Sequence, residues 1–101
     1  MPEFSTPFSV LKNDRNLSDT ELARAVRYSI AAEYEAIQLY EQLAESTDNK
    51  ASKAVLIDIA NEEKEHAGEF LKLLKHICPE EENYYQNGYE EVEEMLEKLN
   101  E

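Results

Sequence analysis

Apolar residues recur at helical spacing along two long stretches of this chain. In the first stretch the positions are 4, 3, 4, 3 and 4 residues apart: Val26, Ile30, Glu33, Ile37, Tyr40 and Ala44. In the second they are 3, 4, 3, 4, 3 and 4 residues apart: Leu56, Ile59, Glu63, His66, Phe70, Leu73 and Ile77. Such spacing places each set on one face of an α-helix. Since no alternating pattern typical of β-strands is found, the sequence predicts an all-α protein.

Polar residues mark the ends of these two helices. Ser18, followed three residues later by Glu21, forms a capping-box pattern that predicts the start of the first helix. That helix should run to the sequence STDNK, which breaks the apolar pattern. Asp48 is the expected N-cap of the second helix, which should extend from about residue 50 to 77 and end before the next proline.

A third helix is expected from Pro79 to the last residue of the sequence. The proline and the three glutamates after it suit a helix N-terminus, whereas the pair Asn87-Gly88 is expected to interrupt the helix. Its apolar stripe, which we expect to pack on a neighbouring subunit, consists of Tyr85, Tyr89, Val92, Leu96 and Leu99. We therefore divide the chain into a flexible N-terminal arm (1–17), a helical hairpin (18–78) and a C-terminal helix (79–101).

The charge of the chain narrows the classes of partner. Its 101 residues carry a formal net charge of −13, and the pI is about 4.5. That charge argues against binding to nucleic acid or anionic lipid and suits cations or a basic partner. The single cysteine, Cys78, excludes an internal disulfide and fits a reducing compartment. Neither a signal peptide nor a membrane-spanning run is predicted, so we expect a cytoplasmic protein.

Ligand-type residues interrupt both apolar stripes. Glu33 does so in the first helix, and Glu63 and His66 do so in the second. Because the chain contains 19 glutamates, a Glu-x-x-His tetrad is weak evidence by itself, and its place on the apolar face is what matters. Glu33 and Glu63 each lie 15 residues from Asp48. Two antiparallel helices joined there would hold both carboxylates at one level, with His66 one turn further along.

Two carboxylates at one level of an apolar seam call for either a proton on one of them or a cation between them, and a divalent cation would resolve the conflict. A bare carboxylate there is costly, and two of them repel each other. Neither stripe offers a lysine or arginine within two turns to neutralise them. Carboxylates combined with an imidazole suit Fe, Mn and Zn. One chain supplies half of a known four-helix dinuclear pattern, so a two-fold dimer would complete a four-helix bundle with four Glu and two His.

At these residues the sequence resembles a known family. SIAAEYEAIQLYEQLAESTD, followed by NEEKEHA, is similar to the encapsulated ferritins, the short ferritin-like cargo proteins of encapsulin nanocompartments. The resemblance covers about residues 18–78 and implies a ferritin-like antiparallel hairpin with a third helix. It also implies homodimers around a ferroxidase site with two Fe per dimer, joined into a ring that is typically a decamer. Such proteins oxidise Fe(II) with O2 and supply iron for mineral storage in the encapsulin shell.

The resemblance also assigns roles to individual residues. The family's iron ligands fall on Glu33, Glu63 and His66, which would be both the metal ligands and the catalytic residues. An acidic residue that gathers metal at a secondary or entry site falls on Glu35, whose plainer interpretation is an exposed charge. A tyrosine beside the site falls on Tyr40, for which core packing is the alternative to a hydrogen bond with the site. Two positions depart from the family pattern, an acidic residue being replaced by Ala32 and an aromatic one by Leu39.

These inferences favour one function over three rivals. We expect a ferroxidase, an Fe(II):O2 oxidoreductase, in the cytoplasm within an encapsulin nanocompartment, either as separate cargo or fused to the shell protein. The first rival is a non-catalytic metal-binding module for oligomerisation, with Zn or Mn as a structural ion, and the second is a helical oligomer without metal. A peroxidase-type domain like that of rubrerythrin shares the ligands. It is disfavoured because one chain lacks the second Glu and second Glu-x-x-His, and rubredoxin-like cysteine pairs are absent.

Overall fold

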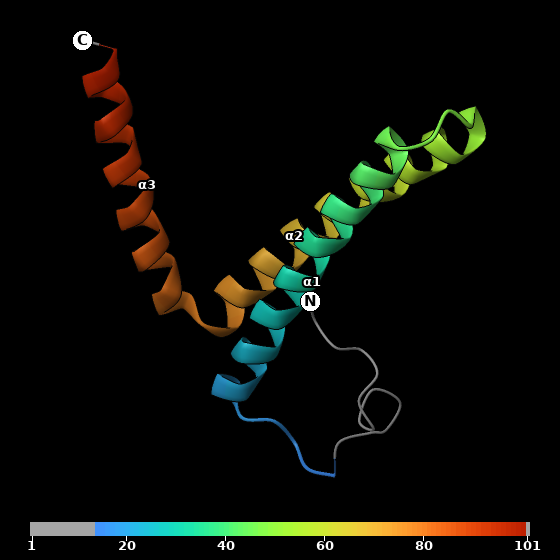
Figure 1. Cartoon of the computed structure of the whole chain (residues 1–101). Helices are drawn as coiled ribbons and strands as arrows, with labels where there is room; N and C mark the ends of the chain where they lie inside the picture. The colour runs from blue at the N-terminus through green and yellow to red at the C-terminus, as the bar shows by residue number, and fades with distance from the viewer. Residues whose placement is uncertain (1–13, 101) are drawn as a thin grey trace.

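Three α-helices make up the part of the chain that the computed structural model describes, residues 14–100. They are α1 (Asp19–Glu45), α2 (Lys50–Ile77) and α3 (Pro79–Leu99). Helices α1 and α2 form an antiparallel hairpin, and α3 leaves the end of α2 at a wide angle (Figure 1). No strand occurs in these residues, which confirms the all-α prediction, and none of the three helices carries an apolar run that would span a bilayer. Most of the predicted N-terminal arm, residues 1–13, lies outside the described residues.

The N-terminus of α1 has the capping box that the sequence predicts. The Ser18 hydroxyl accepts a hydrogen bond from the Glu21 N–H at 3.2 Å, and the Glu21 carboxylate accepts one from the Ser18 N–H at 3.0 Å. Arg15 donates two further bonds to the same carboxylate, at 2.8 and 2.6 Å. These bonds, above all those from Arg15, lower the pKa of Glu21 to about 2. The carboxylate therefore stays ionised and available as an acceptor at neutral pH, which fixes the start of the hairpin.

The turn between α1 and α2 lies at the predicted STDNK sequence but uses a different cap. Asn49 is the N-cap of α2, and its side-chain oxygen accepts a hydrogen bond from the Ser52 N–H at 2.9 Å. The prediction of Asp48 is therefore wrong. An N-cap side chain bonds an N–H two or three residues ahead, so the capping residue must directly precede Lys50. Asp48 is one residue too early.

Helix α3 runs without a break through Asn87-Gly88, so the predicted interruption there is wrong. No residue with positive φ occurs among residues 14–100. A glycine in a helix interior costs only about 1 kcal/mol relative to alanine, and the Glu, Met, Leu and Lys residues that follow favour the helix. A Cβ built on Gly88 would meet nothing within 4 Å, so no close packing requires glycine at this position.

The core of the molecule lies between α1 and α2, and alanines form much of it. Its buried residues are Ala23, Val26, Ile30, Ile37 and Ala44 of α1, and Ala60, Ala67 and Leu74 of α2. The buried α2 residues lie seven apart, beside the stripe predicted for this helix, whose Leu73 is 42% exposed. Small alanines let the helices approach closely, so the centre of contact shifts onto them. The predicted α2 stripe therefore runs along one edge of the contact and is partly open in a single chain.

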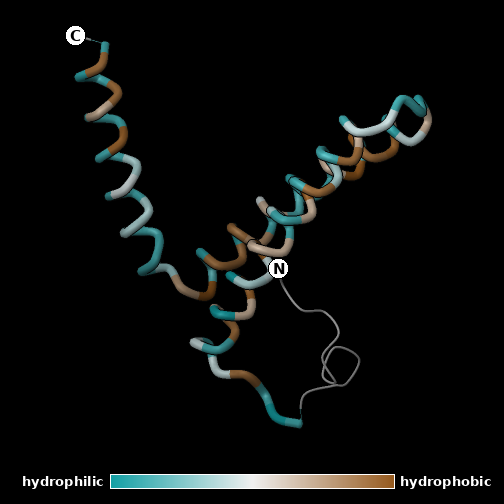
Figure 2. The backbone as a smooth tube through the Cα atoms, in the orientation of Figure 1, coloured by the Kyte–Doolittle hydropathy of each residue, from teal (hydrophilic) through white to brown (hydrophobic). Residues whose placement is uncertain are grey.

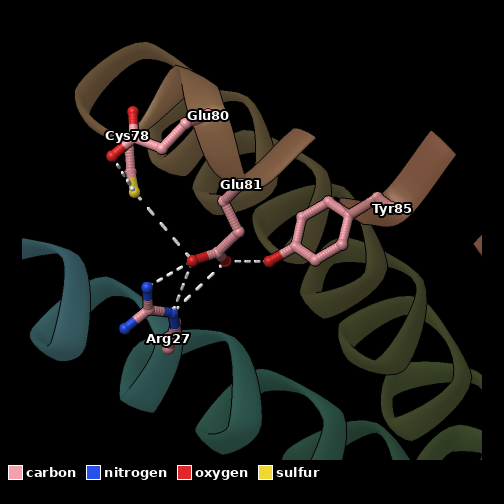
Figure 3. Close-up of polar contacts among 5 residues, drawn as sticks. All are labelled: Arg27, Cys78, Glu80, Glu81 and Tyr85. Atoms are coloured by element: carbon pink, nitrogen blue, oxygen red, sulfur yellow. Dashed lines mark hydrogen bonds and ion pairs between the residues drawn. The ribbon is translucent and has the colours of Figure 1, made fainter. Parts of the chain in front are cut away.

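Helix α3 is held to the hairpin only near its first two turns. The Arg27 guanidinium on α1 binds the Glu81 carboxylate, its Nε lying 3.0 and 3.2 Å from the two oxygens, and the Tyr85 hydroxyl donates to the same carboxylate (Figure 3). The Tyr85 ring packs against the buried cluster of Ala23, Val26, Ile30 and Leu74. Within α3, all of which is described, no residue is buried. Figure 2 shows apolar residues continuing along the part of α3 that stands clear of the hairpin.

Hydrogen bonding shifts the pKa values of the acidic groups at this junction. The bonds from Arg27 lower the pKa of Glu81. The bond that the Tyr85 hydroxyl donates to Glu81 raises the pKa of Tyr85 from 10.0 to about 12, because the carboxylate holds the phenolic proton. Burial, followed by the neighbouring Glu80, raises the pKa of the Cys78 thiol. The thiol therefore acts as a donor, with its sulfur 3.4 Å from a Glu80 oxygen.

The hydrogen bond of Tyr85 makes its titration a test of the junction. Tyr85→Phe should remove a phenolate absorbance step near pH 12 from an alkaline ultraviolet titration, whereas Tyr84→Phe, at a position 74% exposed, should leave it in place. Because the folded-state pKa is raised, the bond stabilises the fold fully below pH about 10, and this stabilisation is lost as the pH rises to about 12. Retention of the step in Tyr85→Phe would contradict the assignment.

Candidate metal centre

The three predicted ligands come from both helices of the hairpin and lie together. Glu33 is in the middle of α1, and Glu63 and His66 are one turn apart on α2. One donor atom from each lies within 4.8 Å of the donor atoms of the other two. The imidazole Nδ1 is 3.4 Å from a Glu63 oxygen and 3.7 Å from a Glu33 oxygen. This is the convergence that the helix register predicts.

The two carboxylates are largely removed from water. The side chains of Glu33 and Glu63 are 18% and 20% exposed, whereas that of His66 is 47% exposed. One Glu33 oxygen, Oε2, is buried and has no hydrogen-bond partner in the described part of the chain. A buried acceptor without a donor costs about 1–3 kcal/mol, and a charged one costs more. A cation bound at this point would remove that cost.

Protein side chains do little to neutralise these carboxylates. Lys64, the residue after Glu63, pairs with Glu41 at 2.9 Å instead. Among residues 14–100, the side chain paired with Glu33 and Glu63 is the His66 imidazole, which is charged only when protonated and lies at distances that are long for hydrogen bonds. Carboxylate oxygens and an imidazole nitrogen are donors that suit Fe, Mn or Zn. The residues present therefore fit a transition-metal ion.

An open hollow of about 500 Å³ lies beside the cluster. Glu33 and Glu63 form part of its wall, together with Glu35 and Tyr40. Glu35 lines the same hollow as the two carboxylates, and Tyr40 does not supply the hydrogen-bond partner that Oε2 of Glu33 lacks. Gln38 also lines the hollow. Its place at the hollow could not be predicted from the spacing of apolar residues, because Gln38 is not on the apolar stripe of α1.

Known proteins share the sequence that carries this geometry. The sequence model of the Rubrerythrin family matches residues 25–101, which include all three clustered side chains. The chain belongs to the rubrerythrin family. It is 43% identical over 81 residues to the encapsulin nanocompartment cargo protein EncC of Myxococcus xanthus. It is also 38% identical over 87 residues to a ferritin-like-encapsulin shell fusion protein of Pyrococcus furiosus.

These two matches cover most of this chain but only part of each relative. They include 80% and 86% of this chain, and they span 61% of the Myxococcus protein and 25% of the Pyrococcus protein. The crystal structure of the encapsulated ferritin domain from Pyrococcus furiosus matches with a TM-score of 0.83 at 37% identity, over 91% of this chain and 94% of that chain. The ferritin-like fold and the resemblance to encapsulated ferritins are thereby confirmed.

Loss of the Glu33 charge should weaken metal binding. Glu33→Gln keeps the shape of the side chain but replaces a charged carboxylate with a neutral amide, which is a much weaker metal ligand. Changes outside the ligand shell already cost tenfold or more in metal affinity, so we expect a loss of at least about tenfold. Isothermal titration with Mn(II) measures this loss, and Mn(II) avoids interference from iron oxidation.

The matched control for this titration is Glu62→Gln, which removes the same charge from an exposed neighbour of Glu63. It should bind Mn(II) like the unmodified chain. Equal affinities in the Glu33 and Glu62 variants would mean that Mn(II) responds only to the general negative charge, and the cluster would not be a metal site.

Proposed function

We propose that this protein oxidises Fe(II) to Fe(III) with O2 at a dinuclear iron site formed between two subunits. The observation that carries the proposal is the buried, unpartnered Oε2 of Glu33 beside Glu63 and His66. A carboxylate in this state needs a cation, and this donor set suits iron. Similarity to an encapsulated ferritin domain and to an encapsulin cargo protein supports iron over other metals.

Two subunits are needed because one chain supplies too few ligands. One copy offers two carboxylates and one imidazole, half of the pattern in which four helices contribute four Glu and two His around two metal ions. The flank that carries these residues is open in a single chain, since His66 is 47% exposed and Leu73, seven residues further along the stripe, is 42% exposed. A two-fold axis through this flank would join the two half-sites and bury the apolar residues. Four carboxylates would balance the charge of two Fe(II) ions.

The residues of the site then have distinct roles. Glu33 and Glu63 would hold the metal ions through their carboxylate oxygens, and His66 would add a ring nitrogen. Glu35, at the wall of the hollow, gathers Fe(II) from solvent, helped by the net charge of −13. Tyr40 lines the hollow beside Glu33 and Glu63, where core packing is its main role. When bound, iron supplies the redox chemistry by giving electrons to O2.

The wider assembly is part of the same proposal. Dimers would join into a ring, a decamer in the pattern of the encapsulated ferritins, inside an encapsulin shell to which the chain belongs as cargo or as a fused domain. The names of the two curated relatives support the shell partner. The exposed apolar stripe of α3 supports contact with another subunit, and its members beyond the hairpin are Tyr89, Val92, Leu96 and Leu99.

One observation also favours a second candidate function. Glu33, Glu63 and His66 suit Zn(II) or Mn(II) as well as iron, and their place on the open flank would let any of these ions join two copies. The protein would then be a non-catalytic metal-binding oligomerisation module. The two candidates differ in whether bound metal reacts with an oxidant.

Anaerobic loading with Fe(II) followed by O2 separates these functions. The unmodified chain should consume O2 and develop ferric absorbance faster than iron in buffer, whereas Glu63→Ala should fall to about the buffer rate because it removes a ligand from each half-site. The control Glu65→Gln, at an exposed position two residues away, should keep the full rate. Stopped-flow absorbance and an oxygen electrode provide the two readouts.

The alternatives give different results in this experiment. Binding of iron without O2 uptake would favour the non-catalytic module. A rapid reaction with hydrogen peroxide but not with O2 would favour a peroxidase of the rubrerythrin type. Equal oxidation by the unmodified chain and Glu63→Ala would contradict the proposed site.

A further inference from the structure

Burial does not determine the direction of α3. Cys78 is the single residue between α2 and α3, so the covalent link by itself permits many angles between them. Helix α3, which is described in full, contributes no buried residue. Beyond its first turns it stands clear of the hairpin (Figure 1). A contact near its start must therefore fix its angle.

One polar contact joins α3 directly to α1 across 54 residues of sequence. The Arg27 Nε lies 3.0 and 3.2 Å from the two Glu81 oxygens, and a terminal guanidinium nitrogen binds the same carboxylate (Figure 3). The Glu81 side chain is only 16% exposed, so water competes weakly for it. Tyr85, one turn along α3, donates its hydroxyl to Glu81 and rests its ring against the hairpin core.

We propose that Arg27, Glu81 and Tyr85 form a latch that fixes the direction of α3 relative to the hairpin. A rigid helix joined through a single residue needs a further contact with the hairpin to hold its direction. The planar guanidinium provides a directional anchor because it reaches both oxygens of one carboxylate. The Tyr85 ring adds a contact one turn away, which resists rotation of α3 about its own axis.

The latch is independent of the candidate metal centre. Arg27 and Glu33 are six residues apart on α1, which places them about 120° apart around the helix. The latch therefore does not rest on the proposed function. In the assembly proposed above, the latch would set the angle at which the exposed stripe of α3 meets another subunit.

Double electron–electron resonance between two nitroxide labels tests the latch in the full chain. Lys72→Cys on α2 and Lys98→Cys on α3 carry the labels, in a Cys78→Ser background. An excess of unlabelled chain ensures that distances within one molecule dominate. The parent should give a single narrow distance, and Arg27→Gln and Glu81→Gln should each broaden the distribution and add new distances.

Arg24→Gln is the matched control, because Arg24 is exposed, lies on the same helix and makes no ion pair within the described residues. It should keep the narrow distribution of the parent. Circular dichroism must show the same helix content in all variants, so that a change of angle is not confused with unfolding. A parent distribution that is already broad would overturn the latch, as would folded Arg27 and Glu81 variants that match the parent.

Discussion

The organisation of this protein depends on carboxylates that are withdrawn from water without a protein cation to balance them. Glu33 and Glu63 lie on opposite helices of the hairpin, and each side chain is less than a quarter exposed. Oε2 of Glu33 has no hydrogen-bond partner among the described residues. The neighbouring Lys64 is engaged by Glu41 instead. An ionised carboxylate that is removed from water must gain a compensating interaction, such as a hydrogen bond or a bound cation. Carboxylate oxygens with an imidazole nitrogen are donors that suit a bound transition-metal ion.

The packing of the hairpin explains why the site is open on one side. Close contact between α1 and α2 is centred on Ala60, Ala67 and Leu74, and this moves the stripe that carries His66 to the edge of the interface. Ligands at an edge can be completed by a second molecule, whereas ligands at the centre of a single-chain core could not. By placing the α1–α2 contact beside the stripe, the alanines leave His66 open to a second copy in the proposed dimer. Family membership supports this arrangement through the fold. The donor set admits iron, zinc or manganese, and the proposal of iron rests on similarity to an encapsulated ferritin domain and to an encapsulin cargo protein.

The sequence predicted those features that follow from helix geometry and register, and missed contacts that depend on the angle between helices. The capping box at Ser18 and the convergence of Glu33, Glu63 and His66 follow from short-range spacing combined with helix geometry, and both are present. Asp48 and Asn49 are both residue types that cap helix N-termini. Asn49 has this role because the first turn of α2 begins at Lys50. The Arg27–Glu81 contact could not be predicted, since it depends on the angle between two helices. The residues of α2 that are buried lie beside the predicted stripe. Periodicity identifies the apolar face of a helix but does not say which edge of that face makes the closest contact.

The most direct test is a crystal of the full chain grown with Fe(II), in which anomalous scattering at the iron absorption edge locates the metal. We predict two iron ions on or beside a two-fold axis, each bound by Glu33, Glu63 and His66 side chains of two copies. Anomalous peaks confined to other acidic residues would contradict the account. A lattice in which these three side chains of every copy face solvent, away from any neighbouring molecule, would do the same.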